Sequence, residues 1–230
     1  IHPNLLCIPI AKIFFAKTSA MITGMGATSI TKNKSLKRFI DLIYRISFLF
    51  CDHIIFVNKN DKNYFIKNLN IRKKNTEVFG AGVSLQKFNK KKIFFESKYN
   101  LKDSFNILFL GRLTKEKGIF DVIKMFKLLD IKNKKLIFIG AFDKTSFSKI
   151  NDNKIFDYPG IVMAGHIKDP HQIYLKSDIF ILPSYTEGMP TTLMEAMRFG
   201  IPTVSYKIAG VEDIIKKDIN GGLVKAGDYI

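Results

Sequence analysis

Two carboxylates near the C-terminal end of the chain have a spacing that suits recognition of a polyol. Glu187 and Glu195 lie in the segment S-Y-T-E-G-M-P-T-T-L-M-E, where an apolar run passes through a Gly-Met-Pro turn into an amphipathic pattern. Pro190 fits the first turn of a helix, and Gly188 permits close backbone approach to a ligand. Because carboxylates are strong acceptors for hydroxyl groups, Glu195 could hold a ribose and Glu187 a sugar. The alternative is ordinary α/β packing with both acids facing solvent.

A second segment, G-R-L-T-K-E-K-G at 111–118, carries two cations at the point where an apolar run gives way to a helical pattern. The N-terminus of a helix presents free N–H groups and a positive dipole. Arg112 would add bidentate donors and Lys117 a point charge, a combination that suits a diphosphate. The alternative is a solvated basic turn, since K-E-K is ordinary surface sequence.

The rear half of the chain alternates short apolar runs with helical patterns. Continuous apolar runs of four or five residues between helices are typical of a parallel sheet buried on both faces. The pattern predicts a doubly wound α/β domain, with strands at 106–110, 136–139, 161–164, 179–182 and 203–206 and helices at 118–129, 170–176, 190–199 and 211–216.

Polar groups follow several of these predicted strands directly. Open parallel sheets bind ligands beyond the carboxyl ends of their strands, so we expect these groups to lie at one edge. A single glycine at such an end is usually only a turn residue. The groups are Gly111-Arg112, Gly140-Ala141, Gly165-His166 and residues 183–187.

The front half is less regular. Helical patterns cover 35–50 and 61–69, and strand patterns cover 52–57 and 77–79. The Lys-rich stretch at 85–103 has no clean period and reads as a connection between two α/β domains. We therefore expect domains at 1–104 and 105–230, the first without its initial strands and the second without its last helices. The start at I-H-P-N and the stop at Y-I favour an internal fragment.

Charge and composition restrict the class of protein. The hydrophobic share of 47% and charged share of 25% are those of a soluble globular protein. Of the net charge of +17, an excess of 13 lies at or before Asp103. Such a surface attracts nucleic acid, anionic lipid or phosphorylated small molecules, unless it only reflects a Lys-rich composition. A basic polyanion-binding α/β protein is thus an alternative, although no nucleic-acid module or basic-aromatic pattern is present.

Several other classes are disfavoured. The two cysteines, Cys7 and Cys51, form no disulfide framework, which favours a reducing compartment. The pattern G-x-G-x-x-G lacks its third glycine at both 24–29 and 80–85, and no Walker lysine motif occurs. A nicotinamide enzyme or a P-loop protein is therefore disfavoured. Because the chain has no Asp-x-Asp metal motif, we expect cationic side chains to take the place of a metal, with no cofactor.

Taken together, the motifs of the rear half resemble a known family. G-R-L-T-K-E-K-G, L-I-F-I-G, A-G-H-I, the long segment around Glu187 and Glu195, and A-G-V-E-D-I-I-K-K-D-I-N-G-G-L-V occur in the order found in the C-terminal domain of family-4 retaining glycosyltransferases of the GT-B type. The resemblance covers about 106–228 and implies two facing Rossmann-like domains, the N-terminal one incomplete here. It also implies that the C-terminal domain binds a nucleotide-sugar donor.

Residue by residue, the resemblance implies the following roles. Arg112 and Lys117 would grip the donor diphosphate and neutralise the leaving group, and Glu187 would hold the donor hexose together with backbone amides. Glu195 would accept from the ribose hydroxyls. With Arg112, Lys117 and Glu187 as catalytic residues, the donor-binding residues would be Gly111, Gly140, Gly165, His166, Ile167, Gly188, Met189, Pro190, Thr191 and Glu195.

The front half resembles the same family more loosely. H-P-N, T-G-M-G, D-H-I-I-F-V-N-K-N-D and G-A-G-V-S-L-Q-K-F are similar to segments of enzymes that elongate glycans on polyprenyl-diphosphate carriers. This implies a UDP-linked hexose or N-acetylhexosamine as donor, a lipid-linked or glycan acceptor, and a role in cell-surface polysaccharide or lipopolysaccharide synthesis. His2, Gly24 and Gly26 would lie on the acceptor side, although a structural role for His2 is equally open.

The resemblance and the charge together imply a cytoplasmic protein at the inner face of the membrane. The predicted helix at 35–50 is too short for a comfortable span. Lys37, Arg38 and Arg45 could meet anionic headgroups while the aromatic face enters the interface. The alternatives are a helix buried in the front domain and, for the whole chain, an inactive glycosyltransferase fragment.

Overall fold

The computed structural model describes residues 2–25, 33–83, 99–142 and 153–229, which form two compact units. Most of the front half falls in one unit and most of the rear half in the other. The predicted boundary near residue 104 stays a prediction, because 84–98 lie outside the described residues. Unit 1 comprises Ile1–Gly82, Thr186–Pro190 and Ile208–Ile214, and unit 2 comprises Val83–Tyr185, Thr191–Lys207 and Ile215–Ile230.

In unit 2 the described residues form a six-stranded sheet in the order β6-β5-β4-β7-β8-β9. Every neighbouring pair is parallel, which confirms the doubly wound α/β fold predicted from the apolar runs. The short last strand had no recognisable pattern in the sequence. The strands are β4 (Phe105–Leu110), β5 (Lys134–Ile139), β6 (Ile161–Gly165), β7 (Ile179–Leu182), β8 (Thr203–Tyr206) and β9 (Gly222–Val224).

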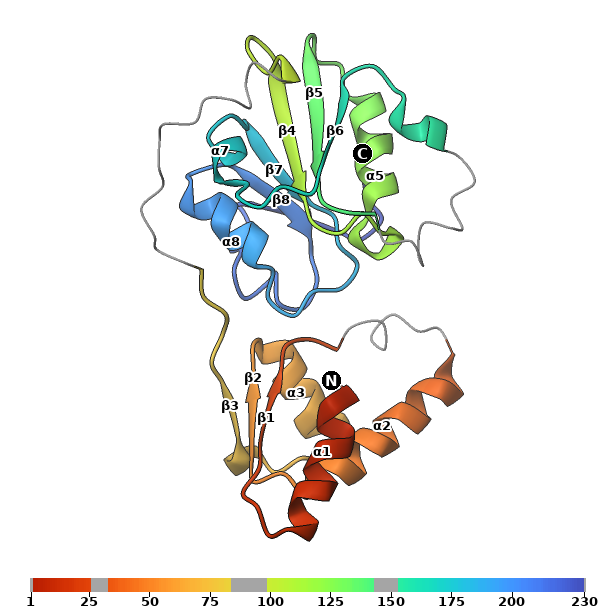
Figure 1. Cartoon of the computed structure of the whole chain (residues 1–230), viewed down its shortest axis with the longest axis vertical. Coiled ribbons are helices and arrows are strands. Elements are labelled where there is room, and N and C mark those ends of the chain that lie inside the picture. Colours follow the sequence, from red (N-terminus) through yellow and green to blue (C-terminus); the bar gives the residue numbers. More distant parts are fainter. Residues whose placement is uncertain (1, 26–32, 84–98, 143–152, 230) are drawn as a thin grey trace. The chain divides into compact units, whose positions relative to one another are not determined.

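Helices cover both faces of this sheet. Figure 1 shows α5 on one side and the pair α7 and α8 on the other. Phe109 and Phe138 of the sheet pack with Phe126 of α5 in a core from which solvent is excluded. The helices are α5 (Ile119–Leu128), α7 (His171–Tyr174) and α8 (Thr191–Arg198), with single 3-10 turns η3 (Lys115–Lys117) and η4 (Asn153–Phe156).

The helix expected at 211–216 is wrong. Residues 211–214 form turns, with Glu212 N–H donating to Ile208 O over 3.2 Å and Ile214 N–H to Val211 O over 2.9 Å. The chain then returns within a few residues to pair β9 with β8, where Lys207 N–H donates to Val224 O. The pairing of β9 with β8 requires this short return, and that requirement outweighs the helical pattern of the apolar residues at 211–216.

Unit 1 is built on a smaller sheet. Its described strands β1 (Ser19–Ile22), β2 (His53–Phe56) and β3 (Thr76–Val78) are parallel and lie in that order. Ile22, Ile54, Phe56 and Phe65 form its core and are shielded from solvent. The helices are α1 (His2–Ile13), α2 (Lys34–Leu49) and α3 (Lys59–Leu69), followed by the 3-10 turn η2 (Lys73–Asn75).

The sequence predicted α2 and α3 to within two residues, and side-chain caps explain why they begin there. Asn33 accepts from Leu36 N–H at the start of α2, and Asn58 accepts from Asp61 N–H at the start of α3. Helix α1 has no such pattern, because its apolar residues surround the axis and Pro9 lies inside it. Within the ranges that the structure describes, no helix has the length and apolar character to cross a membrane.

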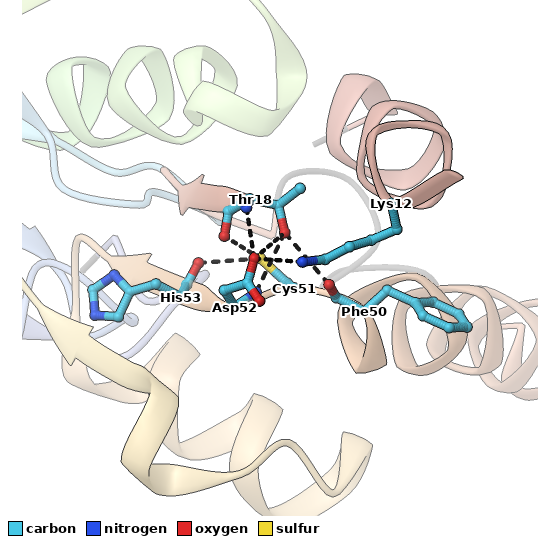
Figure 2. A network of polar contacts seen from close by, with 6 residues as sticks. All are labelled: Lys12, Thr18, Phe50, Cys51, Asp52 and His53. Carbon is cyan, nitrogen blue, oxygen red and sulfur yellow. Dashed lines mark hydrogen bonds and ion pairs between the residues drawn. The ribbon is translucent and has the colours of Figure 1, made fainter. Parts of the chain in front are cut away.

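A polar network ties α1 to the start of β1 and β2 (Figure 2). The Asp52 carboxylate pairs with Lys12 Nζ at 2.6 Å and accepts from Thr18 N–H at 2.6 Å. The hydrogen bond from Lys12, followed by that from Thr18, lowers the pKa of Asp52 to about 2. The Cys51 thiol donates to His53 O within the same cluster. This cluster lies at the amino ends of β1 and β2 and joins them to the end of α1.

Candidate functional site

The strand order of unit 2 reverses between β4 and β7. Numbered from β4 along the chain, the order is third, second, first, fourth, fifth and sixth, so the connections leave β4 and β7 in opposite directions. In parallel sheets of this type, ligands bind outside the carboxyl ends of the strands at such a reversal. The turn after β4 and the loop after β7 carry the two segments that the sequence singled out.

Backbone hydrogen bonds bring the predicted strand-end glycines to one edge. Gly111 N–H donates to Ile139 O, and Gly140 N–H donates to Gly165 O, each over 2.9 Å. Gly111, Gly140 and Gly165 therefore lie in succession across β4, β5 and β6. His166 follows at the surface and Ile167 is half-buried. The ends of three strands thus present backbone groups at the same edge of the sheet as the carboxyl ends of β4 and β7.

The basic turn after β4 has the geometry that the sequence indicated. Arg112 lies two residues after the end of β4 and is exposed, while Lys117 is half-buried at the end of η3. Gly118 then adopts a left-handed conformation with φ of 73° and is the N-cap of α5. The segment that holds both cations therefore leads into a helix N-terminus, where backbone N–H groups and the helix dipole favour an anion.

The turn after β4 and the loop after β7 are held together by backbone contacts. Tyr185 N–H donates to Glu116 O over 2.9 Å. A Cβ on Gly118 would lie 2.0 Å from Pro183 O, so only glycine fits at this approach. The backbone of the segment with the cations is therefore fixed against the loop that leads to Glu187.

Side chains around Asp121, in the first turn of α5, strengthen this contact between the turn after β4 and the loop after β7. Its Oδ2 accepts from the Tyr185 hydroxyl at 2.6 Å and from the Tyr206 hydroxyl at 3.0 Å. Asp121 is buried. Its hydrogen bond raises the pKa of Tyr185 to about 12, and burial followed by the Asp121 charge raises the pKa of Tyr206. No spacing in the sequence indicated this cluster, since its members lie on three separate elements.

Glu195 lies in the second turn of α8, as the sequence predicted, and is half-buried. The Tyr174 hydroxyl donates to Glu195 Oε2 over 2.9 Å. Tyr174 is buried and stacks on Phe199 with ring centroids 5.1 Å apart. Burial, and then the Glu195 charge, raise the pKa of Tyr174, so the tyrosine is a permanent donor that orients the carboxylate. Sequence reasoning missed Tyr174 as well.

The remaining predicted residues belong to unit 1 or its margin. Residues 187–190, with Glu187 and Gly188, lie in this unit together with Gly24. The Asn58 amide donates to Gly188 O over 2.8 Å, and a Cβ on Gly188 would lie 1.6 Å from Thr23 O. Gly188 is thus packed backbone to backbone. Met189 is half-buried, Pro190 is buried and Thr191 begins α8, while His2 begins α1 and Gly26 lies outside the described residues.

Comparison with known proteins decides the family. Residues 89–229, more than half of the chain, match the family model described as glycosyl transferases group 1. The chain belongs to this family of glycosyltransferases. The match covers the basic turn, the strands at the reversal and both acids of the E-x7-E segment.

Relatives of this glycosyltransferase chain act in polysaccharide and lipid-linked glycan synthesis. It is 28% identical over 207 residues to the capsular polysaccharide biosynthesis glycosyltransferase CapM of Staphylococcus aureus, covering 85% of the chain and 54% of that protein. It is 27% identical over 212 residues to the UDP-Gal:alpha-D-GlcNAc-diphosphoundecaprenol alpha-1,3-galactosyltransferase of Escherichia coli, covering 86% and 54%. The chain spans about half the length of these curated relatives.

Solved structures show the same fold. Anabaena Alr3699/HepE in complex with UDP and glucose superimposes with a TM-score of 0.82 at 16% identity, covering 98% of this chain and 62% of that chain. Sucrose-phosphate synthase from Thermosynechococcus elongatus gives a TM-score of 0.81 at 16% identity, covering 98% and 59%. The glycosyltransferase chain therefore has the GT-B fold, with part of that fold present.

Proposed function

We propose that the chain is the donor-binding part of a retaining glycosyltransferase that uses a UDP-linked hexose or N-acetylhexosamine. The acceptor would be a glycan or a lipid-carrier-linked glycan in the synthesis of cell-surface polysaccharide. The observation that carries the proposal is the basic turn of Arg112 and Lys117 at the sheet reversal of a group 1 glycosyltransferase. The UDP named for the relative from Escherichia coli and for the Anabaena structure supports the choice of nucleotide.

The chemistry of the proposal follows from charge. Cleavage of the bond between sugar and diphosphate leaves negative charge on the diphosphate. Arg112, Lys117 and the N-terminus of α5 would stabilise that charge without reorganisation, which is the most effective form of electrostatic catalysis. We propose that these groups act without a resident metal, as the lack of an Asp-x-Asp motif suggests.

The other residues would orient the donor. Because the Tyr174 hydroxyl already donates to Oε2 of Glu195, the other carboxylate oxygen of Glu195, Oε1, would accept from a ribose hydroxyl. Glu187 would accept from hydroxyls of the hexose, with the amides of Gly188 and Met189, and the segment 165–167 would line the base. Neither acid is proposed as a general base, and retention of configuration is proposed from the family resemblance.

Calorimetry with UDP tests the donor site. Each of Arg112→Ala and Lys117→Ala should weaken UDP binding by roughly ten- to a hundredfold, because each removes a charge-assisted contact of roughly 1.5–3 kcal/mol. Lys115→Ala is the matched control, since Lys115 is exposed in the same 3-10 turn. Equal affinity for all three variants and the unaltered chain would refute the assignment.

A donor screen tests the transferase activity itself. Release of UDP from UDP-hexoses and UDP-N-acetylhexosamines should require an added polyprenyl-diphosphate-linked glycan or a free glycan acceptor. Addition of EDTA should leave that release unchanged if the cations replace a metal. If the chain binds UDP but does not release UDP from these donors when an acceptor is added, the donor site is supported and the transferase proposal for this chain is contradicted.

A further inference from the structure

The carbonyl oxygen of Gly188 lies where three segments of unit 1 meet. These are the start of α3, the loop 186–190 and the segment 208–214, which all belong to that unit. Asn58 Nδ2 donates to Gly188 O over 2.8 Å. A Cβ on Gly210 would lie 1.9 Å from the same oxygen. The oxygen is therefore held between an amide donor and a backbone that only glycine can supply.

The side chain of Asn58 is fixed by its own helix. It is completely buried. Its Oδ1 accepts from Asp61 N–H over 2.7 Å, and its Nδ2 donates to Asp61 Oδ2 over 2.9 Å. The first bond is all that capping of α3 requires. Because the amide oxygen faces the helix, the two hydrogens on Nδ2 face the Asp61 carboxylate and the Gly188 carbonyl.

The segment 208–214 is anchored to the same helix start. Lys59 N–H donates to Asp213 Oδ2 over 2.7 Å. Asp213 thus satisfies the first free N–H of α3, as Asn58 satisfies the third. Gly210, in the same segment, has a left-handed φ of 81°. The start of α3 therefore fixes both neighbours of the Gly188 carbonyl, Asn58 directly and Gly210 through Asp213.

The residues on either side of that carbonyl are fixed as well. A Cβ on Gly188 would lie 1.6 Å from Thr23 O, so this residue is packed against the end of β1. Met189 Sδ accepts from Ala81 N–H over 2.9 Å. The peptide that joins Gly188 to Met189 consequently has one defined orientation.

This orientation decides where Met189 N–H points. A trans peptide is planar, so its C=O and N–H point in opposite directions, and the peptide bonds of the described residues are trans. Met189 N–H is therefore aimed away from Asn58. In the part of the chain that the structure describes, no group accepts from this N–H. A hydrogen bond accepted by the carbonyl also makes the N–H of the same peptide a stronger donor.

We propose that Asn58 is a positioning residue for the sugar end of the donor. By holding the Gly188 carbonyl, it aims Met189 N–H at a hydroxyl of the hexose. The inference rests on the proposed function and assigns a part in sugar binding to α3 of unit 1. Asn58 itself touches no substrate. Affinity for UDP alone is independent of it, because the proposed diphosphate contacts, Arg112 and Lys117, belong to unit 2.

The variant Asn58→Ser separates positioning from capping. A serine hydroxyl caps a helix about as well as an asparagine, but it is one atom shorter than the amide and cannot also reach Gly188 O. In calorimetry with the full chain, the variant should bind UDP normally. Its affinity for the tightest binder among UDP-glucose, UDP-galactose and UDP-N-acetylglucosamine should fall by about fivefold. Asn33→Ser, the same change at the N-cap of α2, should alter neither affinity.

The Met189 amide reports on the positioning directly. In the full chain labelled with 15N-methionine, its resonance is the one missing from Met189→Leu. Asn58→Ser should shift this resonance in the absence of any ligand, whereas Asn33→Ser should not. In the unaltered chain, the UDP-hexose should shift it further than UDP does.

A second variant acts on the same carbonyl from the opposite side. Gly210→Ala would place a Cβ against Gly188 O and should cause the same selective loss of affinity for the UDP-hexose. Gly200→Ala is the matched control, because its φ of 74° is similar and a Cβ there would meet nothing within 4 Å. This pair keeps the proposal testable if Asn58→Ser fails to fold.

Three outcomes would overturn the proposal. One is an unchanged Met189 resonance in Asn58→Ser, which would leave Asn58 as the cap of α3 alone. Another is an equal loss of affinity for UDP and for the UDP-hexose, which would indicate a general structural effect. The third is an unaltered chain that binds no UDP, which would refute the donor site and the inference with it. Normal UDP binding without a selective loss counts against Asn58 only, so the two failures are distinguishable.

Discussion

The two units use apolar residues in opposite ways. In unit 2 the strands of the parallel sheet are covered on both faces, and the polar groups gather at the strand ends around the β4–β7 reversal. In unit 1 helices α1 and α2 leave many large apolar side chains outside the described core, beside exposed cations. A sheet covered on both faces can support a ligand site with fixed backbone groups.

The net charge does not follow the same division. Over the residues that each unit comprises, Lys plus Arg number 13 against 7 Asp plus Glu in unit 1, and 24 against 13 in unit 2. In unit 2, Arg112 and Lys117 lie at one turn, where we propose that an anion binds. In unit 1, Lys34, Arg38 and Arg45 are exposed along α2. The variants below test the support of the site in unit 2 and the polar network of unit 1.

The largest effect is expected at Gly118, where the turn after β4 meets the end of β7. Gly118→Ala would place a Cβ 2.0 Å from Pro183 O, so the backbone of one segment must move. We expect a loss of roughly 3 kcal/mol in the free energy of unfolding, measured with urea.

Gly165 supplies the matched control for that substitution. Its φ of 69° is nearly the 73° of Gly118, but a Cβ there would meet nothing within 4 Å. Gly165→Ala should therefore cost only the strain of the left-handed conformation, about 1 kcal/mol. Similar losses in the free energy of unfolding for both variants would show that the close approach of the two loops does not explain the need for glycine at 118.

The next largest effect is expected at the Asp121 cluster. Asp121→Ala would leave the Tyr206 hydroxyl buried without its acceptor, at a cost of about 2 kcal/mol. It should also weaken UDP binding, because Asp121 supports the loop after β7 through Tyr185. Tyr206→Phe, which removes the hydroxyl along with its need for an acceptor, should cost less in a urea titration.

The same cluster predicts a dependence on alkaline pH. The folded-state pKa of Tyr185 is raised to about 12. Its hydrogen bond to Asp121 therefore stabilises fully below the ordinary tyrosine pKa of about 10 and is lost as the pH rises through 12. Tyr185→Phe should flatten the fall in stability between pH 10 and 12. An equally steep fall would show that this tyrosine does not contribute.

The sequence was sufficient for the parts of the fold that depend on local pattern. The apolar runs gave five of the strands in unit 2, and the caps at Asn33 and Asn58 agree with the predicted starts of α2 and α3. The basic turn and the E-x7-E segment could be assigned to the strand ends because parallel strands share an edge. These features need no knowledge of distant contacts.

The features that escaped prediction all depend on contacts between distant residues. Asp121, Tyr185 and Tyr206 meet only because three elements converge, and Tyr174 reaches Glu195 from a separate helix. The turns at 211–214 were mistaken for a helix because the pairing of β9 with β8 decides the path there. Helix α2 packs Tyr44, Ser47 and Phe48 into the described core, and the choice between a buried helix and a membrane-facing helix at 35–50 stays a prediction.

A smaller effect is expected at Tyr174. Tyr174→Phe would remove one neutral donor from Glu195 while keeping the stacked ring on Phe199. We expect a loss of about 1 kcal/mol in stability and a UDP affinity lower by roughly fivefold, because the carboxylate is no longer oriented. Tyr158→Phe, in a half-exposed position outside the site, is the control. Unchanged UDP affinity in the Tyr174 variant would argue against Glu195 as a ribose acceptor.

The smallest effect is expected at Asp52 in unit 1, which is exposed and therefore well screened. Its folded-state pKa is lowered to about 2 by Lys12 and Thr18. The interaction stabilises above the ordinary carboxyl pKa of about 4 and is lost as the pH falls through 2. Asp52→Asn should slightly reduce the unfolding midpoint at pH 7, and the difference should disappear below pH 2. UDP affinity should stay unchanged, because the network lies at the amino ends of β1 and β2. A weaker UDP affinity in this variant would show that the network supports the donor site.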